Sequence, residues 1–316
     1  MILLIFGQMW QEDTLGANKY KPDSLNMTLV KRLRLPTPCF GLAVGNRYAY
    51  LSSLRRIYIV DVSKPESLYR EATFNTTNMP LGLALKGKYL YVGHGYKGLS
   101  VFNVSNPNMV REMYTVPLPD TVMEVLLRGN RLYVTVGDSG FAILSLSNPA
   151  RPRLVSLTKT GGFTRGITVK GKYAYIAAGR GGLKVFDISN PRRPRIVGQA
   201  PTRGFAISVE VEGGVAYVAL GRDGVQLFDV SDPSQPKEIR WAKGPGSALN
   251  VKAINNLIFV AFGDGGVSVI DPFRKVEVAR YRPPIYKGDY VFDIVVQGDY
   301  IYAASRKGMV VYKFLR

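Results

Sequence analysis

Polar residues that recur at equivalent places along the chain are the first candidates for chemistry. Carboxylate and amide oxygens at one level would suit a hard cation such as Ca²⁺, which takes about six to eight oxygen ligands. In the alternative interpretation they line a water-filled channel in which Glu210 and Lys252, 42 residues apart, form a pair. The three residues considered as cation ligands are Glu124, Asn250 and Asp293. The full set of channel candidates is Glu124, Ser208, Glu210, Asn250, Lys252 and Asp293.

A cluster of basic residues is the second candidate. The chain has 42 Lys and Arg against 23 Asp and Glu, a net charge of +19. Cations on adjoining loops without acidic residues suit phosphate, sulfate or carboxylate polymers. No aromatic residue alternates with them, which argues against stacking on single-stranded nucleic acid. The alternative is a surface that maintains solubility or has the charge typical of thermophile proteins. The nine residues are Arg128, Arg131, Arg151, Arg153, Lys170, Lys172, Arg192, Arg193 and Arg195.

Enzyme motifs are missing from the sequence. A single cysteine, Cys39, and a single histidine, His94, exclude an intramolecular disulfide framework and Cys- or His-based metal sites. There is no Walker-type phosphate loop, no Gly-x-Ser-x-Gly elbow and no His-Glu-x-x-His. We interpret Cys39 as a packing residue, His94 as a weak base candidate, and Asp138, Asp223 and Asp264 as hairpin-turn residues. We expect a non-enzyme without a cofactor, with channel Ca²⁺ as the alternative.

A repeat of about 42 residues organises the elements that must position these side chains. Each repeat contains four extended segments separated by Gly, Asn or Pro turns, which is the content of one propeller blade. The composition is 46% hydrophobic and 11% aromatic, which excludes a disordered chain. We predict an all-β, seven-bladed β-propeller of four-stranded antiparallel blades. The repeat is marked by Tyr50, Tyr91, Tyr133, Tyr175, Tyr217, Phe259 and Tyr302, and by Pro65, Pro107, Pro149, Pro191 and Pro233.

The strand nearest the axis has a two-residue pattern. The residue eight positions before each aligned aromatic is aliphatic in all seven repeats, whereas the residues nine and seven positions before it are small or polar except at Leu126 and Val295. Because alternate side chains of a strand point to opposite faces, the aliphatic face is expected between blades and the other face toward the axis. In the repeat that begins at Phe163 we expect strands at 163–169, 173–178, 183–188 and 195–200.

The seventh repeat ends after its third strand, so one strand is missing. Residues 29–35 fit the fourth-strand pattern, and we predict that they complete the last blade and close the ring. We expect an N-terminal arm at 1–28 and one propeller domain at 29–316. Its blades are expected near 40–79, 80–120, 121–162, 163–204, 205–246, 247–288 and 289–316 plus 29–39. The apolar residues 1–7 are interpreted as a retained strand or arm, or else as a truncated export signal.

Three segments carry a recognisable motif: Ile59-Val60-Asp61-Val62-Ser63, Val185-Phe186-Asp187-Ile188-Ser189 and Leu227-Phe228-Asp229-Val230-Ser231. Each is followed after one residue by Pro, and the chain resembles the LVIVD-repeat propellers of archaea and bacteria from about residue 40 to 316. The resemblance implies a propeller, often on secreted or cell-surface proteins, without an activity attached to the repeat. It favours an extracytoplasmic location over a cytoplasmic one.

Three functions follow from these features. The first is a non-enzymatic interaction scaffold whose basic face binds an acidic protein or an anionic surface polymer. The second is a propeller associated with nucleic acid or ribonucleoprotein through the same face. The third is a metal-dependent, lactonase-like hydrolase centred on the channel. Salt-dependent heparin binding, co-purifying nucleic acid and an axial metal would distinguish them.

Overall fold

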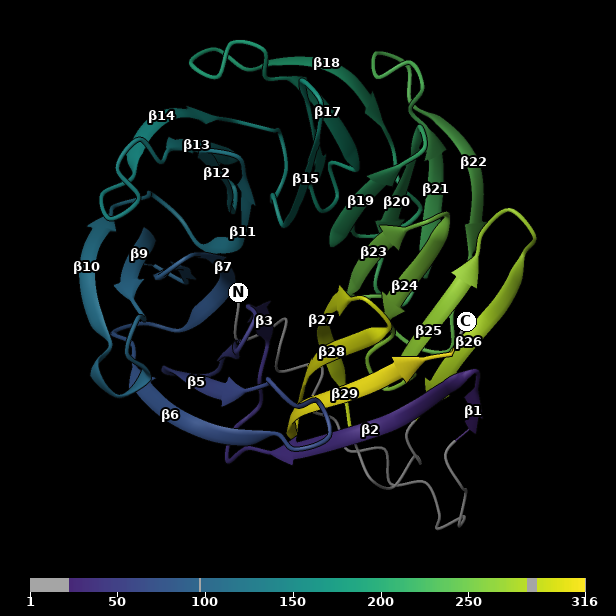
Figure 1. Cartoon of the computed structure of the whole chain (residues 1–316). Coiled ribbons are helices and arrows are strands. Elements are labelled where there is room, and N and C mark those ends of the chain that lie inside the picture. The colour runs from purple at the N-terminus through teal and green to yellow at the C-terminus, as the bar shows by residue number, and fades with distance from the viewer. Residues whose placement is uncertain (1–22, 97, 283–288, 316) are drawn as a thin grey trace.

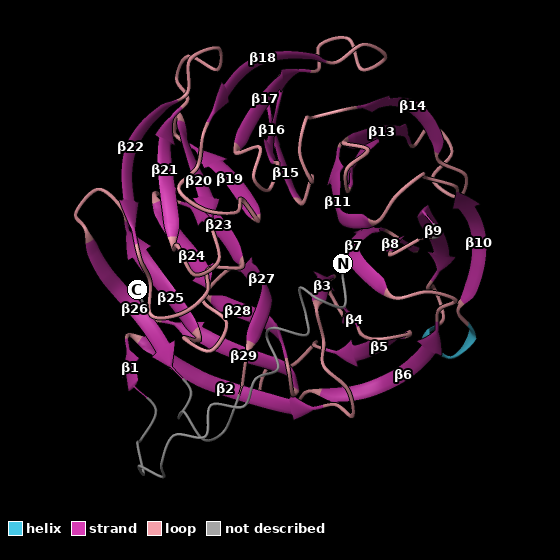
Figure 2. Cartoon of the chain, turned by 180° about the vertical axis from the view of Figure 1, so that it is seen from behind, coloured by secondary structure: helices cyan, strands magenta, loops and turns pink. Residues whose placement is uncertain are grey.

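Seven antiparallel sheets surround a central axis in the computed structural model, which describes residues 23–96, 98–282 and 289–315 (Figure 1). The sequence-predicted all-β propeller is confirmed. Strands dominate the view from behind (Figure 2), and a short 3-10 turn, η2 (Pro107–Met109), lies between two strands of blade two. The expectation for residues 1–7 falls outside the described residues. No helix in the described part of the chain has the length and apolar character needed to cross a membrane.

The first three blades are four-stranded sheets in chain order. Blade one contains β3 (Gly41–Val44), β4 (Tyr48–Ser52), β5 (Arg56–Asp61) and β6 (Tyr69–Asn75). Blade two contains β7 (Pro80–Lys86), β8 (Tyr89–His94), β9 (Gly98–Asn103) and β10 (Arg111–Val116). Blade three contains β11 (Val122–Arg128), β12 (Arg131–Val136), β13 (Phe141–Ser145) and β14 (Arg153–Thr158).

The next three blades repeat this order. Blade four contains β15 (Gly166–Lys170), β16 (Tyr173–Ala177), β17 (Leu183–Asp187) and β18 (Arg195–Ala200), close to the four segments expected. Blade five contains β19 (Ser208–Glu212), β20 (Val215–Ala219), β21 (Val225–Asp229) and β22 (Lys237–Ala242). Blade six contains β23 (Asn250–Ile254), β24 (Leu257–Ala261), β25 (Val267–Asp271) and β26 (Val276–Arg282), with β1 (Asp23–Leu25) as a fifth strand.

Blade seven joins the two ends of the chain. Its inner strands are β27 (Val291–Gln297), β28 (Tyr300–Ser305) and β29 (Gly308–Phe314), and its outer strand is β2 (Met27–Arg34). β2 pairs with β29 from Met27 opposite Phe314 to Arg34 opposite Gly308. The predicted closure of the ring is therefore confirmed, and the closing strand begins two residues earlier than expected. Figure 1 shows β2 beside β29, and β1 beside β26.

Each blade has a bulge in its outer pair of strands, and in blade three a residue beside the bulge contacts the corner of the next blade. The register shifts once between the third and fourth strands of all seven blades, including the pair formed by β29 and β2. In blade three, the residue after this shift is Ser156, whose hydroxyl donates to the Pro191 carbonyl of the blade-four corner at 2.7 Å. Bulges bend the strand and increase its twist. In blade three this bend brings the outer strand into contact with the corner of blade four.

The core consists of seven clusters, each built mainly between two adjacent blades. All seven aligned aromatics lie in the second strand of their blade and are buried. The seven aliphatic residues eight positions before them are also buried, as the two-residue pattern predicts. A buried ion pair, with 3.1 Å between the Arg32 guanidinium and the Asp289 carboxylate, holds β2 against blade seven. The inner strands are thus held in place by packing on both faces.

Candidate functional site

The inner strands β3, β7, β11, β19, β23 and β27 contribute most of the residues that line a cavity of about 390 Å³ on the axis, and Arg165, just before β15, adds the contribution of blade four. Five of the six channel candidates lie on its wall: Glu124, Ser208, Asn250, Lys252 and Asp293. Glu210 is partly buried and turned toward blade four, where its carboxylate accepts a hydrogen bond from the Thr168 hydroxyl at 2.9 Å. The repeat thus brings residues from blades three, five, six and seven to one space.

Glu124 and Asp293 each connect their blade to the next one. The Glu124 carboxylate accepts from the backbone N–H of Ile167 in blade four at 2.9 Å. The Asp293 carboxylate accepts from the N–H of Leu42 in blade one at 3.0 Å and from the N–H of Ile294 at 2.9 Å. Backbone groups at the inner edge of a blade have no neighbouring strand, so these carboxylates supply their partners.

The equivalent position is glycine in blades one, two and four, because the neighbouring inner strands approach closely there. A Cβ on Gly82 would lie 2.6 Å from the Cα of Glu124, and one on Gly166 would lie 2.7 Å from the Cα of Ser208. A Cβ on Gly41 would collide with the Leu81 carbonyl. Backbone therefore forms this level of the wall at blades one and two, and side chains form it at the four blades that carry Glu124, Ser208, Asn250 and Asp293.

The charges in the channel influence one another. Burial raises the pKa of Glu124 to about 7, although Lys252 and the Ile167 N–H act in the opposite direction. Burial also raises the pKa of Asp293, with Lys252 opposing it. Burial alone would lower the pKa of Lys252, but Glu124, Glu210 and Asp293 outweigh that effect and raise it. Lys252 therefore stays charged, while Glu124 takes up a proton near neutral pH.

The predicted pairing of Glu210 with Lys252 is not a direct contact. Within the described ranges, no hydrogen bond and no ion pair of 4.0 Å or less joins the Lys252 ammonium to a carboxylate. The carboxylates act on Lys252 over a longer distance, through the field inside the channel.

The donors available for a metal ion are few. Among the residues that the structure describes, no group of three or more His, Cys, Asp or Glu side chains could hold a metal ion. Glu124 and Asp293 already accept backbone hydrogen bonds, whereas the buried side-chain oxygen of Asn250 has no hydrogen-bond partner in the described chain. A site for Ca²⁺ or for metal-assisted hydrolysis at Glu124, Asn250 and Asp293 stays a prediction.

Arg165 is the channel residue that the sequence analysis missed. It precedes β15 and lines the same cavity. The repeat could have identified it, because Arg165 lies ten positions before the aligned Tyr175 and differs in type from the equivalent residues of the other repeats. In the six other repeats this position is apolar and also lines the cavity: Phe40, Leu81, Met123, Ile207, Leu249 and Phe292.

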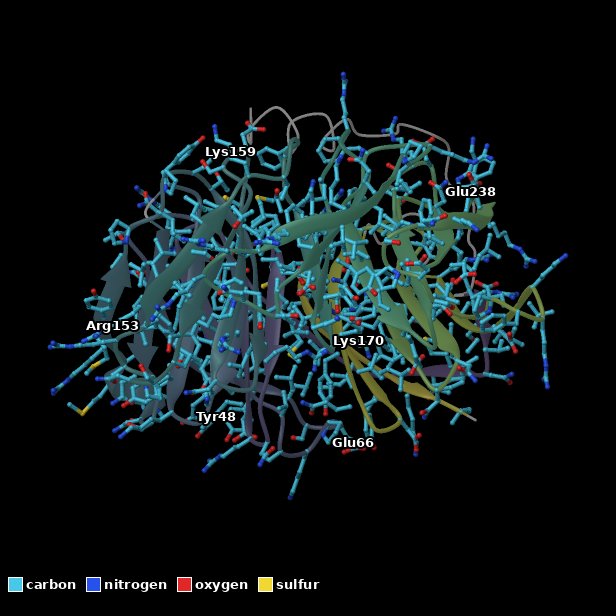
Figure 3. All side chains as sticks on the ribbon, turned by 90° about the horizontal axis from the view of Figure 1, so that it is seen from above. Tyr48, Glu66, Arg153, Lys159, Lys170 and Glu238 are labelled. Atoms are coloured by element: carbon cyan, nitrogen blue, oxygen red, sulfur yellow. The ribbon has the colours of Figure 1, made fainter. Side chains whose placement is uncertain are left out.

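All nine residues of the predicted basic cluster are exposed on the corners and turns of blades three and four. We call these nine residues the basic corners. Seen from the side, Arg153 and Lys170 lie in the lower half of the ring with Tyr48 and Glu66, whereas Lys159 lies at the upper edge (Figure 3). β15 runs from the channel mouth near Arg165 to Lys170, so the basic corners and this mouth belong to opposite faces.

Hydrogen bonds fix the corners that carry the cations. The Tyr91 hydroxyl donates to the Pro149 carbonyl at 3.0 Å, and the side-chain oxygen of Asn190 accepts from the Arg192 N–H at 3.1 Å. The bonds from Tyr91 to Pro149 and from Ser156 to Pro191 tie the two corners to strands of the preceding blades, and the bond within the Asn190 turn fixes the blade-four corner internally. The arginines therefore project from a rigid base.

One acidic and one aromatic residue border the basic corners at strand ends, beside the loops considered in the sequence. Asp187 ends β17, and hydrogen bonds from Ser189 hold its pKa below the usual range, with help from Lys172 and Arg195. The Lys172 ammonium lies 5.4 Å from the centre of the Tyr173 ring. The net charge of the patch is therefore lower by one than the nine cations indicate.

The two other candidates are in the interior. Cys39 is completely buried between β2 and β3, and burial raises the pKa of its thiol to about 12, in keeping with a packing role. His94, the weak base candidate, is also completely buried, at the end of β8. Asp138, Asp223 and Asp264 occupy turns between second and third strands, as expected.

Comparison with known proteins gives the family and the fold. The family model described as the LVIVD repeat matches residues 81–116, 120–160, 161–202, 203–240, 245–271 and 288–311. No curated protein matches the chain. The solved structure of U3-55K is similar, with 14% identity, a TM-score of 0.71, and coverage of 91% of this chain and 98% of that one. The computationally designed protein Ika8 is similar at 9% identity and a TM-score of 0.65, over 89% and 97% of the two chains. At these identities the similarity to the two structures supports the fold only. Because the family model matches more than half of the chain, the protein belongs to the LVIVD repeat family.

Proposed function

We propose that this propeller is a non-enzymatic interaction scaffold whose basic corners bind an acidic protein or an anionic polymer. The propeller fold and its LVIVD repeats suggest an interaction role, and the partner class is our inference from charge. The observation that carries it is the exposure of all nine cations on adjacent corners of one face. Arg fits carboxylate, sulfate and phosphate groups through two parallel hydrogen bonds.

The rigidity of the corners supports this proposal. Binding is strongest when little conformational freedom is lost, and the corners are already fixed by turns and by contacts with the neighbouring blade. The nine side chains themselves remain free to adapt to a flexible acidic segment.

Charge is also distributed unevenly around this face. The turns between first and second strands carry basic residues in blades one and two, including Arg47, Lys86 and Lys88. In blades five and seven the same turns carry Glu212 and Asp299. A long anionic partner would therefore follow the arc from blade one to blade four and avoid the rest of the ring.

The test compares two charge-reversal variants of the full chain. The first carries Arg151→Glu, Arg153→Glu and Arg195→Glu in the basic corners. The control carries Lys159→Glu, Arg180→Glu and Arg222→Glu, three exposed cations outside the basic corners, and has the same net charge. We expect the first variant to elute from heparin at much lower salt than the control, and to lose binding to polyglutamate.

The outcome also distinguishes the alternatives. Equal elution of the two variants would contradict the proposal, because it would make bulk charge responsible. Tighter binding to single-stranded RNA than to heparin at the same salt would favour the nucleic-acid alternative, in which Tyr173 beside Lys172 would offer a stacking surface.

A further inference from the structure

The channel mouth on the face opposite the basic corners has one position that differs from its repeat. Six blades place an apolar side chain there, and blade four places Arg165. A partly buried guanidinium in an apolar ring loses hydration, and burial lowers the pKa of Arg165. Residues that break a local rule without a compensating contact are expected at functional sites.

The backbone of Arg165 is hydrogen-bonded through both its N–H and its carbonyl, whereas its side chain makes no hydrogen bond or ion pair with any residue that the structure describes. Its N–H donates to the Ala177 carbonyl at 2.9 Å, and its carbonyl accepts from the Thr135 hydroxyl at 3.2 Å. Among the described residues its guanidinium has neither a hydrogen bond nor an ion pair. By contrast, Arg203 in the following inter-blade loop pairs with Glu238 at 3.0 Å and lies over the Trp241 ring.

The carboxylates of the channel are not ion-pair partners of the Arg165 guanidinium. Glu124 and Asp293 are held by the N–H groups of blades four and one, and Lys252 balances part of their charge. The titratable group that acts on the pKa of Arg165 is the Tyr290 phenol, which opposes the effect of burial. Arg165 is thus a positive charge at the mouth, and no hydrogen bond or ion pair among the described residues joins it to the carboxylates of the channel.

The opposite side of the mouth is aromatic. In a ring of seven, blade four faces the junction of blades seven and one. At this junction the rings of Phe40 and Phe292 form an edge-to-face pair with centroids 5.2 Å apart, and Tyr290 lies 4.9 Å from Phe292. A ligand that spans the mouth would meet a cation on one side and an aromatic surface on the other.

We propose that the channel mouth binds a small organic carboxylate with an apolar body, its carboxylate on Arg165 and its body against Phe40 and Phe292. The cavity volume of about 390 Å³ lies within the range of small-molecule sites. A single cation suits a monoanion. The carboxylates beneath it repel a multivalent anion. The site lies on the face opposite the basic corners, so it is independent of the polymer binding assigned to them.

Titration calorimetry with the full chain tests the site, with phenylacetate and octanoate as probes and phenylacetamide and octanol as neutral controls. We expect both acids to bind and both neutral compounds to bind at least about tenfold more weakly, since a hydrogen bond to a charged group is lost. Arg165→Gln should weaken binding of the acids about tenfold or more. Arg180→Gln, which removes an exposed charge from a turn of the same blade, should not.

A second measurement separates binding from a structural role. Arg165→Met restores the apolar ring of the other six blades, so the variant should melt at a higher temperature than the unmodified protein in the absence of a probe. Lower stability of Arg165→Met would show that Arg165 supports the fold, and would overturn the proposal. Failure of the unmodified protein to bind either acid at millimolar concentration, or equal binding by Arg165→Gln, would overturn it as well.

Discussion

Replacing Glu124 with glutamine should stabilise the protein, and the gain should grow with pH. The pKa of Glu124 rises from its ordinary value of 4.5 to about 7 in the folded protein. Between these values the unfolded chain has lost the proton and the folded protein keeps it, so the free energy of unfolding falls as pH rises. Above about pH 7 both states are ionised and the full penalty is present.

The magnitude follows from this difference of about 2.5 in pKa. One pKa unit corresponds to about 1.4 kcal/mol, which gives an upper limit of between about 3 and 4 kcal/mol. Glu124 also faces the channel, where solvent screens its charge, so we expect about 1–2 kcal/mol. Glutamine keeps a side-chain oxygen that can accept from the Ile167 N–H, so the bond between blades three and four is preserved.

The assay is urea unfolding of the unmodified protein and Glu124→Gln, followed by tryptophan fluorescence at several values between about pH 4.5 and pH 8. Glu66→Gln, which removes one exposed negative charge, is the matched control. The curves should meet near the acid end and separate up to about pH 7. Parallel curves would refute the argument from burial. A loss of stability in Glu124→Gln at high pH would show that the connection to blade four needs the full negative charge.

Three further predictions concern the ring itself. Gly82→Ala should destabilise the protein by several kcal/mol in urea unfolding, since its Cβ would meet backbone at 2.6 Å, whereas Gly95→Ala, with open space around it, should change little. Asp289→Ala should lower stability by about 3 kcal/mol or more because Arg32 loses its buried partner, and differential scanning calorimetry checks this value. Cys39 should react with a thiol reagent at the rate of global unfolding, because it is completely buried; rapid labelling of the native protein would contradict this.

The repeat made the ring predictable from sequence. A period of about 42 residues and the contents of one repeat give the number of blades, and the missing last strand gives the closure by β2. Blade one carries the motif Ile59-Val60-Asp61-Val62-Ser63 but lies outside the segments matched by the family model. The periodicity identified it as a blade all the same.

The details of the site depend on the spacing between neighbouring blades, which the repeat length of the sequence does not specify. Glu124 and Asp293 were recognised as polar positions, but their bonds to Ile167 and Leu42 depend on the spacing between blades. Arg165 was missed because the pattern was followed from nine residues before the aromatic, one residue too late to include it. The fifth strand of blade six, β1, has only three residues and gives no periodic signal.

The pairing of β1 with β26 and of β2 with β29 has a consequence for how the ring can come apart. These strands are separated by a single residue, Asn26, whose side chain donates to the Val278 carbonyl of blade six. The segment from β1 to β2 therefore pairs with two blades at once, and we call it the clasp. The ring can open at blade seven only when β2 separates from β29, and the pairing of β1 with β26 on blade six keeps the start of β2 in place. We expect the clasp to act mainly on the rate of unfolding, so its removal should shorten the lifetime of the native state more than the equilibrium free energy suggests.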